Sequence, residues 1–389
     1  MSEVLFEITK DNLETGLRGY PCGYCTTSFV DPIKGVTYVG KPVDEIVDWG
    51  PEKVMYLLYA GKEGSEQELQ AFKQELIKRS TCSSDMLEYI QKLPREGHSM
   101  KLLCAAMLIA GMFETTNDYR QDCLNLIAKM PVIVAHVINY HAGWGETPPS
   151  KPELGYMENF AHMLNVPQKT FPRLTEVFKI FNILHYDHGG GNLSTFVGKA
   201  TASGLEDMYG SITSALAALA GPRHGKANQD SLEFVEKMLK EIGPESSEEK
   251  VEKLLHQKLA NNELIYGFGH AVLRVEDPRA IVFYDYVHKN YPQHPYVKMT
   301  SLLRTVGTKV LKENPKISNP FPNVDAISGT ALSAAGFPYP EYFTVLFSLS
   351  RIVGIAIQIV YERCEAREGK GTPIVRPKYI YKPRNEIKK

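Results

Sequence analysis

The chain has 389 residues, 43% of them hydrophobic, which is enough to bury a substantial core in two or three domains. Because 44 lysines and arginines face 45 aspartates and glutamates, the net charge of -1 gives no overall attraction to nucleic acid or an anionic membrane. Residues 1–19 resemble neither a secretory signal nor an Arg-rich transit peptide, so a cytoplasmic location is predicted by default. The longest apolar stretch, residues 352–360, is too short to span a bilayer, so no membrane span is predicted.

Six cysteines are too few for a disulfide scaffold in a chain of this length, which agrees with a reducing compartment. Cys22 and Cys25 have the CxxC spacing of a redox pair or of half a zinc site. No second CxxC occurs, and no strand-helix pattern follows the motif. The spacing alone therefore assigns it no function.

The first 50 residues have a pattern typical of short strands. Polar and β-branched residues lie at 26–28 and 36–39, and the turn-forming pair Asp31-Pro32 lies between them. From Pro51 onward the apolar residues recur at spacings of three and four, first at 54–58 and then at 69–76. This period predicts helices that face a core.

An Ala-rich helix is predicted over 208–220, because Gly221-Pro222 cannot continue it. The next helix begins near Asn228 or Asp230, has apolar residues along one face, and ends at Gly243-Pro244. Ser246 or Ser247 then caps a charged helix.

Asp277 and Pro278 predict a further helix, since an aspartate cap is followed by proline at the first helical position. The longest helix in the C-terminal part of the chain is predicted over residues 338–365. It is apolar almost all round and is therefore expected to be buried. The final segment from 374 has two prolines and many cations, so it is expected to be extended and to lie on a partner.

Three histidines lie beside glycines at predicted helix ends: His188 in DHGGGN, His224 in GPRHGKAN and His270 in YGFGHAVL. Because glycine has no side chain, a substrate can approach the backbone and the adjacent imidazole closely. A single histidine of this kind is usually a core or loop residue bonded to a nearby carbonyl. Three in similar settings favour a shared pocket.

Charged residues in the later part of the chain could complete this pocket. Arg279 follows the predicted cap, Asp325 lies in NVDAISG, Arg351 lies within the apolar helix, and Arg376 lies in the final segment. An arginine inside a buried helix needs a partner, because an unpaired charge there costs several kcal/mol. A substrate carboxylate could accept a bidentate bond from the guanidinium, and the alternative is an ion pair within the protein.

Five motifs in this order, GPRHGKANQ, YGFGHAVLRVEDPRA, PNVDAISG, SRIVGIAIQ and VRPK, resemble the citrate synthase family, closest to its eukaryotic-like branch. The segment GLRGYPCGYCTTSFVDPIKGVTYVGKP resembles the start of the family, so the resemblance covers nearly the whole chain. It implies an all-α, two-domain fold with a few short N-terminal strands, assembled as a homodimer. The large domain would comprise residues 1–226 and 328–389, and the small domain residues 227–327.

The implied reaction condenses acetyl-CoA with oxaloacetate and water to give citrate and CoA, with no metal and no cofactor. In it His224 would bond the thioester oxygen, His270 would polarise the oxaloacetate ketone, and Asp325 would remove the methyl proton. The residues implied to bind oxaloacetate are His188, Asn192, Arg279, Arg351 and, from the second subunit, Arg376. Ser194 and Asn323 are implied as supporting residues, and Leu264, Ile265, Gly267 and Arg274 as the part that meets coenzyme A.

The chemistry of enolisation agrees with these roles. Removing a proton beside a thioester produces an enolate, whose oxygen needs a preorganised donor such as an imidazole on a glycine turn. A carboxylate can act as the base only if it is shielded from water.

The sequence departs from the family's pattern around the catalytic histidine. Arg223 stands where the family usually has leucine, Lys226 where it has a small or apolar residue, and Gly189 where the related branch often has glutamate. One hypothesis is that Arg223 and Lys226 attract the phosphates of coenzyme A. The other is that they pair with acidic neighbours such as Glu206 or Asp207.

Other functions remain open on the sequence. His185 and His188, with the carboxylate of Asp187, could bind a transition metal, although no further ligand is evident nearby. The sequence does not match a Rossmann site, because no third glycine follows Gly267 and Gly269 at the required spacing. Within the family, the alternatives are a 2-methylcitrate synthase using propionyl-CoA, an enzyme running citrate cleavage in reverse, and a non-catalytic paralogue that binds CoA or a dicarboxylate.

Overall fold

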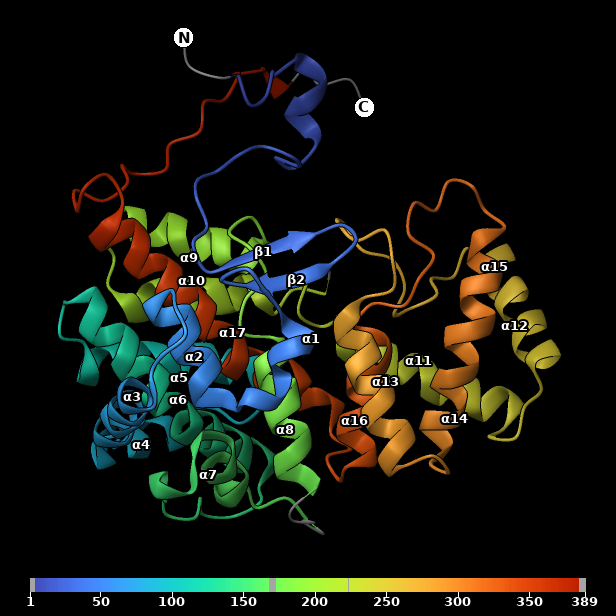
Figure 1. The fold of residues 1–389 in the computed structure, drawn as a ribbon, viewed down its shortest axis with the longest axis horizontal. Coiled ribbons are helices and arrows are strands. Elements are labelled where there is room, and N and C mark those ends of the chain that lie inside the picture. Colours follow the sequence, from blue (N-terminus) through green and yellow to red (C-terminus); the bar gives the residue numbers. More distant parts are fainter. Residues whose placement is uncertain (1–3, 168–172, 223, 385–389) are drawn as a thin grey trace.

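The computed structural model describes residues 4–167, 173–222 and 224–384, and most of these are helical (Figure 1). The prediction of an all-α fold with a few short N-terminal strands is confirmed. Strands β1 (Ser28–Asp31), β2 (Gly35–Tyr38) and β3 (Lys41–Pro42) form one antiparallel sheet in that order. Asp31 closes the turn between β1 and β2, because its Oδ1 accepts hydrogen bonds from the amides of Ile33 and Lys34, both at 2.8 Å.

The helices of residues 10–219 are built around one large hydrophobic core. They are η1 (Lys10–Glu14), α1 (Val43–Ile46), η2 (Val47–Trp49), α2 (Pro51–Ala60), α3 (Glu66–Arg79), α4 (Ser84–Gln91), α5 (Ser99–Glu114), α6 (Tyr119–Ala142), η3 (Pro152–Leu154), α7 (Tyr156–Met163), α8 (Arg173–Leu184), α9 (Leu193–Ser203) and α10 (Met208–Leu219). Three of these, η1, η2 and η3, contribute no buried residue.

The later helices complete the fold. They are α11 (Ala227–Ile242), α12 (Glu248–Ala260), α13 (Pro278–Asn290), α14 (Pro295–Leu302), η4 (Leu303–Gly307), α15 (Thr308–Lys312), α16 (Asp325–Ala334), η5 (Pro340–Tyr342), α17 (Phe343–Val360) and η6 (Tyr361–Glu365). Figure 1 shows α11 to α15 as a separate lobe, in yellow and orange, beside the larger body.

A second hydrophobic core lies within this lobe. It is formed by buried residues of α11, α12, α14, η4 and α15, among them Phe234, Leu255 and Val306. Residues of α13 and α16 belong instead to the large core, so these helices connect the two parts. The division into a large domain of residues 1–226 and 328–389 and a small domain of residues 227–327 stays a prediction.

Helix ends follow local sequence signals. Ser247 caps α12 by accepting a bond from the Lys250 amide, and Asp277 caps α13, which has Pro278 at its first position. Helix α11 begins at Ala227, slightly before the predicted start, because the backbone already turns at Lys226.

The helix predicted over 338–365 is α-helical over only part of that range. The chain forms a 3-10 turn at Pro340–Tyr342, then α17, then a π-helical turn at Tyr361–Glu365. All of α17 except Phe347 is buried. The helix therefore runs through the large core as the apolar pattern indicates.

Gly354 fixes α17 against the loop that precedes α9. Its amide donates to the Tyr186 carbonyl at 3.1 Å, and a Cβ at this position would lie 2.5 Å from that oxygen and 2.6 Å from Asp187 Cβ. Only glycine permits so close a contact. This contact places Arg351, one turn earlier on α17, beside the loop that carries His188.

Two helical segments are long and apolar enough to cross a membrane, Tyr119–Ala142 and Pro340–Glu365. Within the structure, 89% and 94% of their apolar windows are buried by the rest of the protein. Core helices of globular proteins pass the same test of length and composition, so this is weak evidence for a membrane span.

Candidate active site

A cleft of about 1110 Å³ opens among the N-terminal segment, the starts of α9, α11, α13 and α16, and α17. It brings together eight of the residues predicted from the sequence: His188, Asn192, His224, His270, Arg279, Asn323, Asp325 and Arg351. These residues come from positions 188 to 351, so the fold, and not the local sequence, assembles them.

His224 lies on the turn between α10 and α11 and is held by Ser194 at the start of α9. The amide of Ser194 donates to His224 Nε2 at 3.2 Å, and the Ser194 hydroxyl lies 2.9 Å from the same nitrogen. Since Nε2 accepts a hydrogen bond, the proton of the neutral imidazole is on Nδ1. Burial and the nearby Arg351 lower the pKa of His224 to about 4, so the ring is neutral at pH 7.

His270 is oriented by its own loop. Its Nδ1 accepts hydrogen bonds from the amides of Val272 at 3.0 Å and Leu273 at 2.9 Å. Nε2 therefore carries the proton, and the ring can donate from that side. Burial and the charge of Arg279 lower the pKa of His270 to about 4, which keeps this imidazole neutral as well.

Asp325 is the first residue of α16, and Asn323 ties this helix start to the His270 loop. The Asn323 side chain accepts a hydrogen bond from the Asp325 amide at 3.0 Å and donates one to the Gly269 carbonyl at 2.9 Å. The backbone amide of Asn323 donates to the Gly267 carbonyl. Burial raises the pKa of Asp325 to about 6, although Arg279 and Arg351 act in the opposite direction. A carboxylate with this pKa suits a general base near neutral pH.

His188 lies in the loop between α8 and α9, which Asn192 folds back on itself. The Asn192 side-chain nitrogen donates to the carbonyls of Gly189 at 2.8 Å and His188 at 3.3 Å. His188 Nε2 is buried without a hydrogen-bond partner in the described part of the chain, and its ring centre lies 5.2 Å from that of His270. Burial and two arginines hold the pKa of His188 well below its usual value, so a ligand is needed to satisfy Nε2.

Arg279 is buried and forms an ion pair with Asp277. Its Nε and Nη2 donate to the two carboxylate oxygens at 3.1 and 2.7 Å. The alternative of an ion pair within the protein is thus what the structure shows for this arginine. Its Nη1 has no partner among the described residues, so one face of the guanidinium can still reach a ligand in the cleft.

Arg351 is 2% exposed and projects from the buried helix α17 into the cleft. Its Nε donates to the His185 carbonyl at 2.9 Å, and its guanidinium lies 4.6 Å from the centre of the Phe347 ring. No described carboxylate forms an ion pair with it, and its two terminal nitrogens have no hydrogen-bond partner there. Burial lowers the pKa of Arg351 to about 10, so it stays charged at pH 7.

The residues predicted to meet coenzyme A do not line this cleft. Leu264 is 69% exposed, and Ile265 packs on the core of the smaller lobe. Arg274 Nη1 donates to the carbonyls of Val272 and Leu273 in its own loop. Gly267 has φ +82° and lies so close to Ala326 that a Cβ would be 2.7 Å from its Cα, so it is required for the contact with α16. Their role in binding coenzyme A stays a prediction.

Arg376 also lies outside the cleft of its own chain. It is exposed in the extended final segment, which follows the prediction for that segment. The amide of the preceding Val375 donates to Ser203 at 2.9 Å and holds the segment on α9. A role for Arg376 in the site therefore requires a second subunit.

Lys226 has an acidic partner, although not one of those expected. Its Nζ lies 2.8 Å from Asp230 Oδ1, one turn along α11. Asp207 instead caps α10 through the Gly210 amide. The pair with Asp230 favours a structural role for Lys226, and Arg223 lies outside the described residues.

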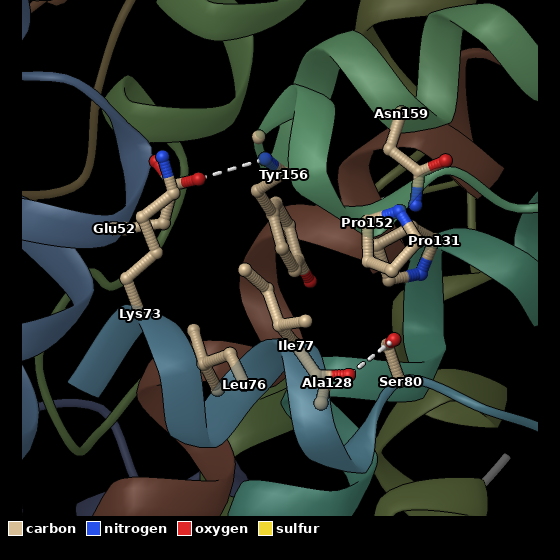
Figure 2. Close-up of a pocket in the computed structure, with 11 residues that line it drawn as sticks. Glu52, Lys73, Leu76, Ile77, Ser80, Ala128, Pro131, Pro152, Tyr156 and Asn159 are labelled. Atoms are coloured by element: carbon tan, nitrogen blue, oxygen red, sulfur yellow. Dashed lines mark hydrogen bonds between the residues drawn. The ribbon is translucent and has the colours of Figure 1, made fainter. Parts of the chain in front are cut away.

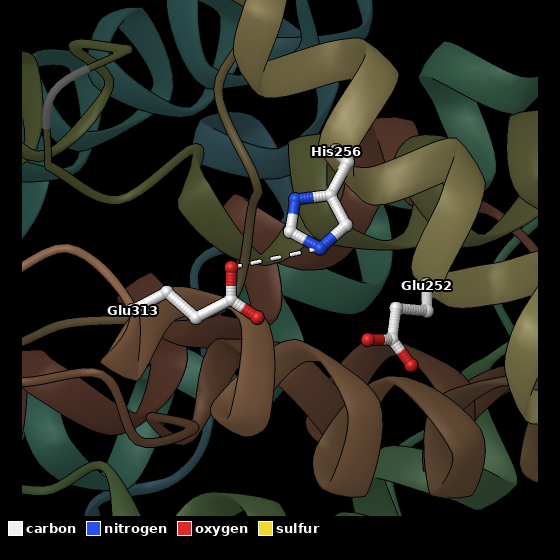
Figure 3. Close-up of side chains that lie close together, drawn as sticks. All are labelled: Glu252, His256 and Glu313. Atoms are coloured by element: carbon white, nitrogen blue, oxygen red, sulfur yellow. Dashed lines mark ion pairs between the residues drawn. The ribbon is translucent and has the colours of Figure 1, made fainter.

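The metal site proposed at His185, Asp187 and His188 has no geometric support. His185 Nδ1 is 2.7 Å from the Phe181 carbonyl, and the Asp187 carboxylate accepts bonds from Thr27, Gln358 and the His188 amide. In the described residues, the donor atoms of Glu252, His256 and Glu313 do gather within 4.8 Å (Figure 3). That group is largely exposed, and Glu252 already pairs with Lys309, so it is not a candidate metal centre.

A second cavity, lined by α3, α6 and α7, is far smaller than the cleft. It measures about 30 Å³, and Figure 2 shows Leu76, Pro131 and Tyr156 around it. This is room for a water molecule and not for a substrate.

Several residues at the site were not identified from the sequence. Asp277 was read only as a helix cap, although its carboxylate also neutralises Arg279. Arg18 and Phe347 line the cleft as well. The signal for Arg18 was its position between glycines in GLRG, while nothing in the sequence distinguishes Phe347 from its apolar neighbours.

Comparison with known proteins gives one consistent family. The family described as "Citrate synthase, C-terminal domain" matches residues 16–378. Citrate synthase 4, mitochondrial, from Arabidopsis thaliana is 32% identical over 400 residues, covering 97% of this chain and 83% of that protein. The mitochondrial citrate synthase of Daucus carota is similar to the same degree.

Solved structures agree with these relatives. Citrate synthase from Thermotoga maritima has a TM-score of 0.79 at 26% identity, covering 97% of both chains. The citrate synthase of Thermoplasma acidophilum, solved as a ternary complex with carboxymethyl coenzyme A and oxaloacetate, has a TM-score of 0.83 at 26% identity, covering 96% of this chain and 97% of that one.

The relatives contradict the cytoplasmic location predicted by default from residues 1–19. Four curated relatives at 32% identity, from Arabidopsis thaliana, Citrus maxima and Daucus carota, are mitochondrial proteins. The prediction was wrong because charge and apolar runs in a short N-terminal segment describe targeting signals only loosely.

Arg351→Gln should abolish binding of a four-carbon dicarboxylate such as malate while leaving the free protein as stable as the wild type. The substitution removes a buried charge that lacks an ion-pair partner, so little stability is lost, but it also removes charge-assisted bonds to the ligand, and affinity should fall by about 10²-fold or more. Thermal unfolding with and without malate measures both effects. Arg120→Gln, in an exposed pair with Glu365, is the matched control and should keep the ligand-induced shift. A full shift in Arg351→Gln would contradict the assignment.

Proposed function

This chain belongs to the citrate synthase family and is an acyltransferase of that type, and we propose that it condenses acetyl-CoA with oxaloacetate and water to give citrate and CoA. The observation that carries the proposal is Arg351, a buried cation that faces the cleft without an ion-pair partner in the described chain. A substrate carboxylate would supply that partner. Enzymes of this family use no cofactor, because acetyl-CoA is a substrate.

In this proposal oxaloacetate binds through its carboxylates and its ketone. One carboxylate would bond the terminal nitrogens of Arg351, and His188 and the free Nη1 of Arg279 would bond the remaining oxygens. His270 would donate its Nε2 proton to the ketone oxygen, because its Nδ1 is already occupied by two amides. A neutral donor polarises the ketone without forming an ion pair with the carboxylates.

Asp325 and His224 would then form the enolate of acetyl-CoA. Asp325 removes a proton from the methyl group, and His224 donates from Nδ1 to the thioester oxygen as negative charge develops there. The bond from the Ser194 amide fixes the His224 ring before the substrate arrives. Preorganisation of this kind lowers the barrier because the donor does not have to reorient during the reaction.

The enolate carbon attacks the ketone carbon, and the new alkoxide takes the Nε2 proton of His270, which is replaced by the proton that Asp325 removed from the methyl group. Water then hydrolyses the thioester and releases CoA and citrate. The residues given roles in enolisation and condensation, Asp325, His224 and His270, line the cleft in this chain. A non-catalytic paralogue would not need a carboxyl at position 325 whose pKa is raised toward neutrality, so Asp325 favours the enzyme.

We propose in addition that the active form is a homodimer in which Arg376 completes the neighbouring subunit's site. In the single chain the guanidinium of Arg376 is exposed and outside the cleft. Large apolar side chains near both ends of the chain, including Leu5, Ile8, Ile380 and Tyr381, are more than half exposed, as expected for a surface that a partner covers.

Acetyl-CoA should release free thiol only when oxaloacetate is present, and propionyl-CoA should react more slowly. The extra methylene of a propionyl group typically costs about 10-fold or more in kcat/KM when the pocket is built for acetyl. A thiol-detection assay with each acyl-CoA, with and without oxaloacetate, measures this directly. Equal or faster turnover of propionyl-CoA would indicate a 2-methylcitrate synthase, and thiol release without oxaloacetate would indicate a thioesterase.

The kcat/KM for acetyl-CoA should fall as the pH drops below about 6, by about tenfold per unit, because Asp325 must be ionised to act as the base. His224 and His270, with pKa values lowered to about 4, stay neutral through this range. Asp325→Asn should lower kcat by about 10²–10⁴-fold and leave oxaloacetate affinity unchanged. Asp285→Asn, an exposed carboxylate on α13, is the control. A wild-type inflection that persists in Asp325→Asn would refute this assignment.

Mixing two inactive variants should restore activity if Arg376 is shared between subunits. A dimer of one Arg376→Ala and one Asp325→Asn subunit has one site with both defects and one with neither. Random exchange of equal amounts should recover about a quarter of the wild-type activity. Native mass spectrometry verifies that mixed dimers form. Mixed dimers without recovered activity would rule out sharing across the interface.

A further inference from the structure

Cys22 and Cys25 both line the edge of the cleft, although the proposed reaction uses neither. Both lie near Gly190 in the loop that follows His188: Cys22 Sγ lies 3.9 Å from its carbonyl oxygen, and Cys25 Cβ lies 3.5 Å from where a Cβ on Gly190 would be. Cys22 is exposed and Cys25 is half-buried. The two cysteines therefore lie beside the same loop of the cleft.

A glycine lies between the two cysteines. Gly23 has φ +147°, which residues with side chains rarely adopt. Two residues, Gly23 and Tyr24, separate Cys22 from Cys25, which is the CxxC spacing of redox-active dithiols. Gly23 lies close to the buried ion pair of Lys199 and Glu362, because Glu362 Oε1 is 3.5 Å from the position of a Cβ on Gly23.

The remaining four cysteines lie in different surroundings. Burial raises the pKa of Cys82 to about 12 and of Cys104 to about 11, and it also raises the pKa values of Cys123 and Cys364. Groups with raised pKa values stay as unreactive thiols at neutral pH. Each therefore serves as an internal control for chemistry at the CxxC motif.

Cys25 is linked to His188 by a short chain of hydrogen bonds. Its Sγ lies 3.4 Å from Thr27 Oγ1, Thr27 donates to Asp187, and Asp187 accepts from the His188 amide at 2.8 Å. On the other side, the Gly189 amide donates to Ser28 Oγ at 2.8 Å. Movement of Cys25 would therefore displace the loop that carries His188.

We propose that Cys22 and Cys25 form a redox-active dithiol that a small-molecule disulfide converts into an intramolecular disulfide, and that this disulfide weakens binding of the dicarboxylate substrate. The exposed Cys22 thiolate attacks one sulfur of the oxidant and releases a first thiol. The Cys25 thiolate then attacks Cys22 Sγ and releases a second thiol. Two electrons pass from the protein to the oxidant, and the two thiol protons are lost from the protein.

Formation of this disulfide does not depend on the proposed function, whereas its effect on the substrate does. Drawing Cys25 toward Cys22 pulls on Thr27 and Ser28, which hold the His188 loop on both sides. Oxidation should therefore change the affinity for oxaloacetate more than it changes the stability of the fold. The two parts can be measured separately.

The first experiment titrates the full chain with mixtures of oxidised and reduced glutathione, blocks free thiols, and maps the products by mass spectrometry. The peptide with residues 22–25 should lose two hydrogens in the wild type and recover them with dithiothreitol. Cys25→Ser should accumulate a glutathione adduct on Cys22, because the resolving thiol is missing, and Cys22→Ser should form no internal disulfide. Cys104→Ser should behave as the wild type. A stable adduct in the wild type, or no reaction at residue 22, overturns the dithiol.

The second experiment measures oxaloacetate binding by calorimetry before and after oxidation. Oxidation should weaken binding by about fivefold or more in the wild type, and the treated Cys22→Ser variant should bind as it does when reduced. Equal affinity in both wild-type forms overturns the link to His188. If the reduced protein fails to bind oxaloacetate while the disulfide still forms, the proposed function fails and the link to substrate falls with it, but the dithiol stands.

Discussion

The cleft depends on a positive charge that the protein buries without pairing it by contact. Arg351 is carried into the core by α17, whose apolar residues and close contact at Gly354 leave no freedom to withdraw it. Asp187, itself fully buried, favours the charged form of Arg351 but is saturated by Thr27, Gln358 and the His188 amide. The negative charge of Asp187, which is nearby but not in contact, offsets the desolvation cost of burying Arg351 and leaves its terminal nitrogens available.

The same environment determines the state of the imidazoles around that charge. Burial, together with the nearby Arg351 and Arg279, lowers the pKa values of His224 and His270, and backbone amides occupy one nitrogen of each ring. Both rings are therefore neutral donors with a fixed tautomer. A cationic ring would form an ion pair with a carboxylate of the substrate. A neutral ring can instead donate a hydrogen bond that strengthens as negative charge develops on an enolate or alkoxide.

The sequence predicted the features that depend on neighbouring residues, and it did not predict those that depend on contacts between residues far apart in the chain. The cap at Asp277, the strands near residue 30 and the buried α17 follow from spacing, proline and apolar pattern. The pair of Lys226 with Asp230 also follows a local rule, the helical spacing of four, which could have been applied. The second role of Asp277 and the steric role of Gly267 could not be predicted, because each depends on a residue or helix brought near only by folding.

The homodimer proposed above would supply a positive charge that the cleft lacks. Arg279 is offset by Asp277 and Arg351 by the field of Asp187, and the ionised base Asp325 adds a further negative charge before a dianionic substrate enters. A further cation is needed to balance the substrate. Within the chain, Arg18 lines the cleft, but it is exposed, and water screens an exposed charge strongly. Figure 1 shows the N-terminal and C-terminal segments projecting from the same side of the molecule. A partner that covered their exposed apolar residues would exclude water there and bring in a cation whose charge is not screened.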